Sequence, residues 1–129
     1  MIKQEIKLTE NQVIQMHSSL IGATKGLNGV RDEGLLKLSL DSPYQTFGGM
    51  VLYSELLAKA ARLCFSLVSN HPFADGNKRI GVHAMLVYLT LNGIKITYTQ
   101  EELVNIGLSL ASGTMRFEEL HAWLTNHCV

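Results

Sequence analysis

The sequence predicts an all-α protein: a compact single-domain bundle of about six helices with a central buried helix. Three observations favour this fold class. Apolar residues recur along most of the chain at the spacing of amphipathic helices. Glycine, proline and asparagine interrupt the pattern between these segments. No repeat, low-complexity tract or long linker divides the 129 residues, so we expect residues 1–129 to form one domain with its own core.

The first predicted helix begins after Thr9. Thr9 and Gln12 have the three-residue spacing of a capping box, and Leu8 and Val13 have that of a hydrophobic staple. This helix is expected to run to about Leu20.

A glycine-punctuated loop over residues 22–29 precedes the second helix, which is short. Asp32 is placed to cap it, and it should stop before Pro43 because proline disfavours helical geometry in the residue before it. Residues 43–50 contain two aromatic residues and a glycine pair but no helical period. They are expected to form a loop or a small hairpin flap.

Two strong helices follow. The first begins near Ser54, and its apolar positions are Leu56, Leu57, Ala60, Leu63, Cys64, Leu67 and Val68. Pro72 should end it near Asn70. The second begins just past Gly76 and is terminated by Asn92 and the glycine after it. Few of its positions are polar, so we expect it to be the central buried helix.

The C-terminal part predicts two more helices. Residues 94–98 alternate and suggest a short extended segment. Thr99 and Glu102 form another capping box for the fifth helix, which Gly113 interrupts. The sixth helix carries Phe117, Leu120 and Leu124.

Composition narrows the function classes. Eleven basic residues balance eleven acidic ones, which argues against a dedicated binder of nucleic acid or of an anionic membrane. No apolar run has the length of a signal-peptide core or a membrane span, so a cytoplasmic protein is expected. Cys64 reads as a core residue and Cys128 lies near the end of the chain. Two such cysteines predict neither a disulfide framework nor a metal site.

The bend between the two strong helices, NHPFADGNKR (70–79), concentrates polar and special-geometry residues. Gly76 and Asn77 fall at the first turn of the following helix, where backbone N–H groups are unpaired and the helix dipole is positive. Lys78 and Arg79 add two formal positive charges there. The turn therefore predicts an anion site, and phosphate is its natural ligand.

Three further residues of this loop suggest chemistry. Asp75 suits a Mg²⁺ ion that bridges a carboxylate and a phosphate. His71 carries an imidazole, which is suited to removing the proton from an attacking hydroxyl. Phe73 offers no chemistry and is expected to anchor the loop in the core. Together these residues indicate phosphoryl or nucleotidyl transfer to a hydroxyl.

Structural interpretations compete with this one. His71 could bind the last carbonyls of the preceding helix, Asp75 could be only an N-cap, and Lys78 and Arg79 could form a solvated turn. The functional interpretation is favoured because cations at a helix N-terminus are unfavourable without an anion. A zinc site from His71, Asp75 and His83 is poorly spaced. The remaining histidines are expected to be surface or satisfied core residues: His17, His83, His121 and His127.

The stretch His71-Pro72-Phe73-Ala74-Asp75-Gly76-Asn77-Lys78-Arg79 resembles the signature of the Fic/Doc family, His-x-Phe-x-Asp/Glu-Gly/Ala-Asn-x-Arg. The fixed spacing makes this motif specific. From about residue 20 onward, the segments GLNGVRDEGLLKLSLDSP, FGGMVLY and LTLNG are similar to the Doc (death-on-curing) branch. The resemblance implies the family's compact helical bundle.

The resemblance also implies residue roles. His71 would be the catalytic base, Phe73 the loop anchor and Asp75 the Mg²⁺ ligand. The anion-holding turn would consist of Gly76, Asn77 and Lys78, and Arg79 would pair with a nucleotide phosphate. The family's target-docking flap would fall at residues 44–49.

One position separates two chemistries. AMP-transferring members of the family usually have glycine after the motif asparagine, whereas this chain has Lys78, as in the Doc branch. Members of the Doc branch, which this chain resembles, are toxins that transfer the γ-phosphate of ATP to a threonine of translation elongation factor Tu. The resemblance therefore implies a Mg²⁺- and ATP-dependent protein kinase that blocks translation, with AMP transfer as the alternative.

A partner is implied as well. Many relatives restrain themselves with a helix of pattern Ser/Thr-x-x-x-Glu-Gly/Asn. Here the candidate glutamates, Glu10 and Glu33, are preceded four positions earlier by Ile6 and Gly29, so an antitoxin protein acting in trans is expected. A non-catalytic binding module and a metal-dependent phosphohydrolase are the alternatives from other classes, and the phosphohydrolase would need more metal ligands than Asp75 alone provides.

Overall fold

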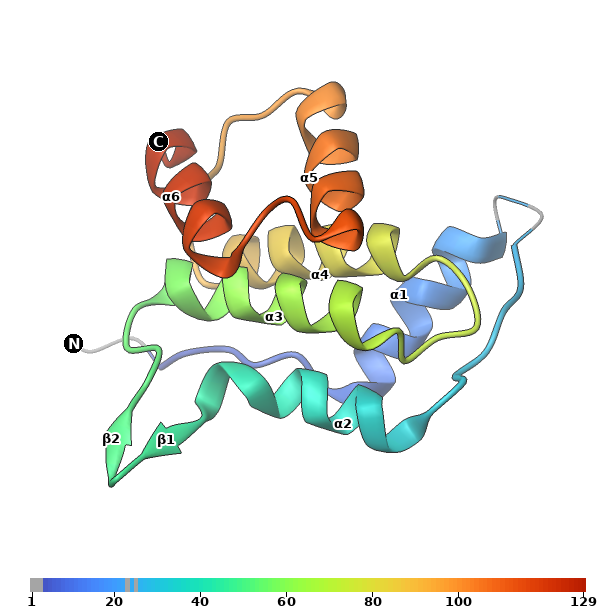
Figure 1. Ribbon diagram of the computed structural model, residues 1–129, viewed down its shortest axis with the longest axis horizontal. Coiled ribbons are helices and arrows are strands. Elements are labelled where there is room, and N and C mark those ends of the chain that lie inside the picture. Colours follow the sequence, from blue (N-terminus) through green and yellow to red (C-terminus); the bar gives the residue numbers. More distant parts are fainter. Residues whose placement is uncertain (1–3, 23, 25) are drawn as a thin grey trace.

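The computed structural model describes residues 4–22, 24 and 26–129. Within these residues it contains six α-helices, one short 3₁₀ helix and one two-stranded hairpin (Figure 1). The elements are α1 (Glu10–Gly22), α2 (Glu33–Asp41), η1 (Ser42–Tyr44), β1 (Thr46–Phe47), β2 (Met50–Val51), α3 (Leu56–Asn70), α4 (Asn77–Leu91), α5 (Gln100–Ser112) and α6 (Phe117–His127). The all-α prediction and the expected number of helices are confirmed.

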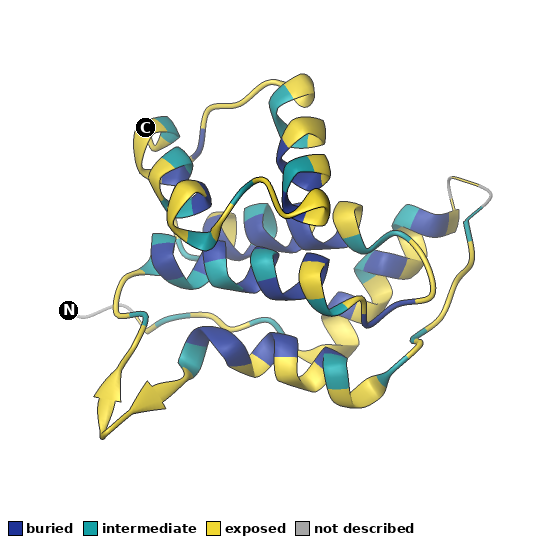
Figure 2. Cartoon of the chain, viewed as in Figure 1, coloured by how far each residue is buried: buried dark blue, intermediate teal, exposed yellow. Residues whose placement is uncertain are grey.

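α3 and α4 lie side by side through the middle of the molecule, with α5 and α6 on one side and α2 on the other (Figure 1). Both helices carry continuous buried positions (Figure 2). α4 is the central buried helix that the sequence predicted, and α3 shares the core with it. Gly81 permits this close packing, because a Cβ there would lie 2.7 Å from Val68 Cγ2 and 3.2 Å from the carbonyl oxygen of Cys64.

The helix ends agree closely with the sequence signals. The Thr9 hydroxyl accepts from the Gln12 N–H at 3.2 Å, and the Gln12 side chain accepts from the Thr9 N–H at 2.9 Å. Thr99 and Glu102 form the second capping box. Asp32 Oδ1 accepts from the N–H of Leu35 at 3.0 Å. α1 extends two residues beyond the expected end, to Gly22, and α3 ends at Asn70 as predicted.

The flap region forms a small hairpin. Thr46 pairs with Val51 and Phe47 with Met50, and the hairpin projects from the body of the molecule (Figure 1). Phe47 is 79% exposed and Met50 72% exposed. Residues 94–98 contribute a single bridge, Ile96 to Cys128, and no regular strand.

The segment before α1 is tied to three other elements through Glu5. Its carboxylate accepts from Lys59 Nζ at 2.7 Å, from the Tyr44 hydroxyl at 2.7 Å and from the Tyr88 hydroxyl at 2.9 Å. Burial alone would raise the pKa of Glu5, but these three donors outweigh it and hold the pKa below its usual range. Burial and the adjacent carboxylate raise the pKa of both tyrosine hydroxyls.

Both cysteines are free thiols in the described residues. Cys64 is fully buried in the core, and burial raises the pKa of its thiol, whereas Cys128 is exposed. None of the helices in residues 4–22, 24 and 26–129 combines the length and apolar character needed to cross a bilayer.

Candidate active site

The α3–α4 loop begins at His71, which adopts a left-handed backbone conformation with φ 50° and ψ 55°. Among the described residues no other non-glycine residue has positive φ. Such a conformation in a side chain other than glycine costs on the order of 1–3 kcal/mol and persists only where neighbouring contacts enforce it. The His71 side chain is exposed and has no hydrogen-bond partner within the described part of the chain.

Arg31 provides the neighbouring contacts that hold this bend. Its Nε donates to the carbonyl of His71 at 2.8 Å, and its Nη2 donates to the carbonyl of Asn70 at 3.3 Å. The guanidinium therefore satisfies the C-terminal end of α3, which is electrostatically suited to a cation. The structural alternative that His71 itself binds these carbonyls is wrong, because Arg31 occupies that place.

The main chain of the loop is also paired with the segment before α2. The carbonyl of Pro72 accepts from the N–H groups of Arg31 at 2.7 Å and Asp32 at 3.0 Å. The N–H of Ala74 donates to the carbonyl of Gly29 at 3.0 Å. These bonds fix the loop's path without using the His71 side chain.

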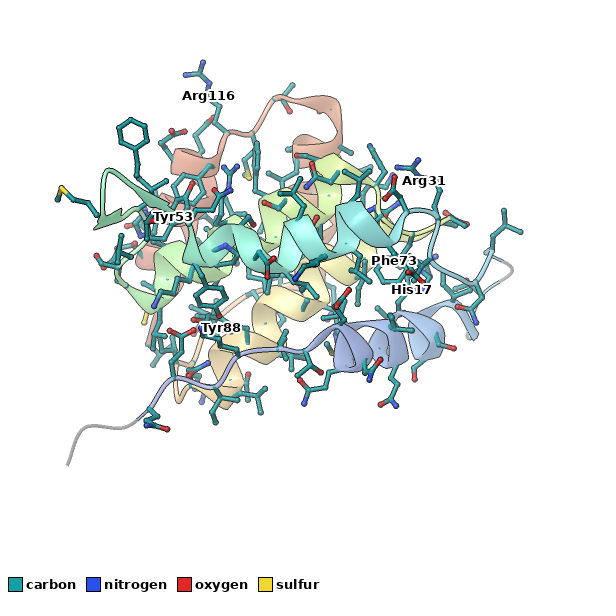
Figure 3. All side chains as sticks on the ribbon, turned by 90° about the horizontal axis from the view of Figure 1, so that it is seen from below. His17, Arg31, Tyr53, Phe73, Tyr88 and Arg116 are labelled. Carbon is teal, nitrogen blue, oxygen red and sulfur yellow. The ribbon has the colours of Figure 1, made fainter. Side chains whose placement is uncertain are left out.

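Phe73 and His17 support the loop from inside. Phe73 is 1% exposed, and its ring stacks on the imidazole of His17 with centroids 3.8 Å apart and an interplanar angle of 11° (Figure 3). His17 Nε2 lies 2.6 Å from the carbonyl oxygen of Asp75. Because a carbonyl can only accept, Nε2 carries the proton in this contact. His17 therefore connects α1 to the loop through both a ring stack and a hydrogen bond.

Asn77 closes the loop onto α4. Its side-chain oxygen accepts from the N–H of Phe73 at 3.0 Å, and its amide nitrogen donates to the carbonyl of Phe73 at 3.1 Å. Both ends of the amide are thus engaged by the protein. Only the main-chain N–H of Asn77 is left to face an anion.

The first turn of α4 has the properties of an anion cradle. Gly76 is the N-cap, with φ 77°, and the first N–H donated into the helix is that of Ile80, to the carbonyl of Gly76. The N–H groups of Asn77, Lys78 and Arg79 have no acceptor among the described residues. Lys78 and Arg79 are exposed and form no ion pair there. Three free donors, a helix dipole and two cations therefore meet at this turn.

Asp75 lies beside this cradle and is exposed. Its Oδ1 accepts from the N–H of Gly76 at 2.8 Å, while Gly76 holds the N-cap position and receives no side-chain cap. The alternative that Asp75 is the N-cap is therefore wrong. A Cβ on Gly26 would lie 2.8 Å from Asp75 Oδ2, so the glycine leaves room around this oxygen.

The donor set at the loop suits a metal held mainly by a substrate. Among the described residues no three His, Cys, Asp or Glu side chains form a potential metal group, so His71, Asp75 and His83 do not make the zinc site considered above. One exposed carboxylate, with Oδ2 unpaired among the described residues, beside an anion cradle is the arrangement that fits Mg²⁺ shared with phosphate oxygens.

A cleft of about 550 Å³ opens next to the cradle, between α4 and α5. Lys78 and Arg79 lie at its charged end, and Val82, Leu86 and Leu103 contribute apolar walls. Gly107 lets α5 approach, because a Cβ there would lie 3.3 Å from Lys78 Cβ.

His17, His83 and His127 behave as the sequence predicted, whereas the buried Nε2 of His121 has a close contact with Glu55 but no well-aligned hydrogen bond among the described residues. His17 is a satisfied core residue, and His83 is exposed. His121 Nε2 lies 2.6 Å from Glu55 Oε1, and His127 Nε2 lies 2.8 Å from Glu102 Oε2. Sequence reasoning nevertheless missed that His17 and Arg31 support the loop. The four-residue spacing of Val13, His17 and Ile21 was a signal for an inward-facing histidine on α1.

The model of the Fic/DOC family matches residues 7–89 of this chain, which includes α1 to most of α4 and the loop described above. A similar protein is the Toxin Doc of Mycolicibacterium smegmatis, 42% identical over 67 residues. That similarity covers 52% of this chain and 52% of the relative, so the match spans about half the length of each. The family match extends over more than half of the chain and contains the whole signature loop. This chain belongs to the Fic/DOC family.

Proposed function

We propose that the protein is the toxin of a toxin–antitoxin pair and transfers the γ-phosphate of ATP to a serine or threonine hydroxyl of a target protein. The observation that carries this proposal is the α4 turn, which has three N–H groups without an acceptor among the described residues and two exposed cations, with the exposed His71 at the other end of the same loop. The similarity of this chain to a protein named Toxin Doc supports the toxin role. The resemblance of the signature and its flanking segments to the Doc branch suggests translation elongation factor Tu as the target.

Different residues of the chain are proposed to act as the base, to hold the phosphate oxygens and to position the loop. A ring nitrogen of His71 accepts the hydroxyl proton as the oxygen–γ-phosphorus bond forms and the bond to the β-phosphate oxygen breaks, so that ADP leaves. The N–H groups of the α4 turn hold phosphate oxygens, and Lys78 and Arg79 balance their charge. Arg31, Phe73 and the Asn77 side chain keep the loop in the conformation that this step requires.

Asp75 is the residue proposed to hold Mg²⁺. Its Oδ2 has no hydrogen-bond partner among the described residues, and Gly26 leaves space around it. When bound, the ion neutralises phosphate charge. The chain contributes the carboxylate and the adjoining N–H cradle.

The position of Lys78 favours kinase chemistry over AMP transfer. In AMP transfer the hydroxyl would attack the α-phosphorus and pyrophosphate would leave. Lys78 stands where AMP-transferring relatives usually have glycine, and a Cβ on Gly107 of α5 would lie 3.3 Å from its Cβ. A lysine at this position leaves less room than glycine for a triphosphate to lie with its α-phosphate at His71. AMP transfer is the second candidate because the same cradle and base could serve it.

An antitoxin is the proposed partner, and the cleft between α4 and α5 is its proposed binding site. Val104 is 58% exposed and Leu108 51% exposed on this face, beside Lys78 and Arg79. An amphipathic segment with an acidic end would match both the apolar wall and the cations. We further propose that residues 1–129 act as a single Fic/Doc-like domain in the cytoplasm; one continuous core containing residues from all six helices supports the single domain.

The position of the label distinguishes the chemistries. The protein is incubated with Mg²⁺, purified elongation factor Tu and ATP labelled at either the α- or the γ-phosphate. Label on the target from the γ position alone supports the kinase. Label from the α position alone contradicts it in favour of AMP transfer. Release of free phosphate with no labelled protein indicates a phosphohydrolase.

A further inference from the structure

A small pocket lies between α2 and α3, on the surface that joins the flap to the α3–α4 loop. Its volume is about 140 Å³. Arg62, Phe65 and Ser69 form its α3 wall at helical spacing, with Asn70 at the loop end and Gln45 at the flap end. Asn70 is the residue before His71, and Gln45 is the residue before β1. This α2–α3 pocket therefore connects the two parts of the site that a protein substrate would touch.

Arg62 is the charged group in this pocket, and no acidic side chain among the described residues pairs with it. It forms no ion pair and no hydrogen bond among the described residues, and its Nε is buried without an acceptor. The Glu55 carboxylate, seven residues earlier in the sequence, contacts His121 at 2.6 Å. A carboxylate binds favourably to a partly buried guanidinium with unused donors, because it can accept hydrogen bonds from two of the N–H groups at once.

Three aromatic rings hold the guanidinium in place. Its carbon lies 5.7 Å from the ring centre of Tyr53, 5.2 Å from that of Phe65 and 5.9 Å from that of Phe117. These cation–π contacts stabilise the charge and limit the side chain's freedom, but they provide no hydrogen-bond acceptor. Arg62 is thus preorganised for an anionic group that none of the described residues supplies.

We propose that the α2–α3 pocket binds an acidic side chain of the target protein and so selects acceptor sites with a nearby glutamate or aspartate. This inference rests on the proposed function, because it assumes a protein substrate. The pocket has the size of one side chain, its lining hydroxyl and amide groups are polar, and its one charge is positive. Charge complementarity therefore identifies the occupant as a carboxylate.

The position of the acidic residue follows from the length of α3. Arg62 precedes His71 by nine residues, which corresponds to roughly 13 Å along a helix at 1.5 Å per residue. An extended peptide covers that distance in about four residues at 3.3 Å each. The acidic residue is expected about four positions from the acceptor hydroxyl.

The test uses fluorescent synthetic peptides that contain one threonine and one glutamate placed at each position on either side of it. Binding is measured by fluorescence polarisation without nucleotide, for the wild type and for Arg62→Gln and Arg62→Glu. We expect the wild type to prefer glutamate about four positions from threonine by roughly tenfold, and Arg62→Gln to lose that preference. Arg62→Glu should instead prefer the matching lysine peptides. Lys37→Glu is the control for an equal charge change on exposed α2, and thermal melts verify that each variant is folded.

The outcomes separate this proposal from the proposed function. A preference that Arg62→Glu reverses supports the pocket even if no phosphate is transferred from ATP. Transfer that occurs with the same peptide ranking in the wild type and Arg62→Glu overturns the pocket and leaves the kinase intact. Binding of acetate that depends on Arg62, with no dependence on the acidic position in the peptides, identifies a small-anion site and also overturns the proposal.

Discussion

At the scale of single residues, the loop geometry depends on side chains outside the signature. His17 stacks on Phe73 and donates to the carbonyl of Asp75, while Arg31 donates to the carbonyls of Asn70 and His71. These contacts bracket the loop from α1 and from the segment before α2. The left-handed backbone of His71 is therefore held by two residues that need take no part in the chemistry.

Replacing His17 with alanine should both destabilise the fold and slow transfer. The substitution leaves a cavity under Phe73 and removes a short hydrogen bond, at a cost of about 2–4 kcal/mol in the free energy of unfolding. Urea unfolding measures the stability, and transfer to the target measures the rate. His83→Ala, at an exposed position, is the control for unfolding. A His17→Ala protein as stable as this control would contradict the supporting role.

At the scale of elements, α3, α4 and the loop between them show which features local sequence patterns predict. The two capping boxes and the end of α3 before Pro72 depend on residues at most four positions apart, and they were predicted correctly. The contacts of Arg31 and His17 with the loop span 39 to 58 positions, and no local pattern indicates them. The spacing of the motif predicted the position of the anion turn. Only the folded geometry shows that the Asn77 side chain hydrogen-bonds to the main chain of Phe73.

The first turn of α4 requires glycine at position 76 for two reasons. Its φ of 77° disfavours any side chain, and a Cβ there would lie 2.8 Å from the buried Ile21 Cδ1. Gly76→Ala should lower the free energy of unfolding by about 2–4 kcal/mol and weaken nucleotide binding.

Gly113→Ala is the matched control for this change. Gly113 has φ 79°, but a Cβ there meets nothing within 4 Å, so its cost should be about 1–2 kcal/mol from the backbone alone. Chemical denaturation and calorimetric titration with ATP measure both variants. Equal decreases in the free energy of unfolding of the two variants would show that contact with Ile21 is unimportant.

At the scale of the whole molecule, Glu5 connects the N-terminal segment to η1, α3 and α4. Its three partners lie 39, 54 and 83 positions away in the sequence. Sequence patterns did not predict this network, because Glu5 precedes the first helix and belongs to no periodic segment. The Glu5 carboxylate thus stabilises the packing of the N-terminal segment on three elements rather than any one element.

This network predicts a pH dependence of stability. Because the pKa of Glu5 is lower in the folded protein, its contribution is fully present above the unfolded pKa of about 4.3 and is lost as the pH falls through the folded pKa. Glu5→Gln should cost about 1–3 kcal/mol in the free energy of unfolding at neutral pH and less in acid. Urea unfolding across that pH range measures the difference, with exposed Glu118→Gln as the control. A cost that stays constant from neutral pH to acid would exclude the charged network.

The most direct measurement compares the wild type with His71→Ala in one assay that determines both ATP affinity and the rate of phosphate transfer to the target. His71 is exposed and the cradle uses only α4 groups, so ATP affinity should be unchanged while the transfer rate falls by about 10²–10⁴. A variant that binds ATP and transfers phosphate at the wild-type rate would show that His71 is not the base.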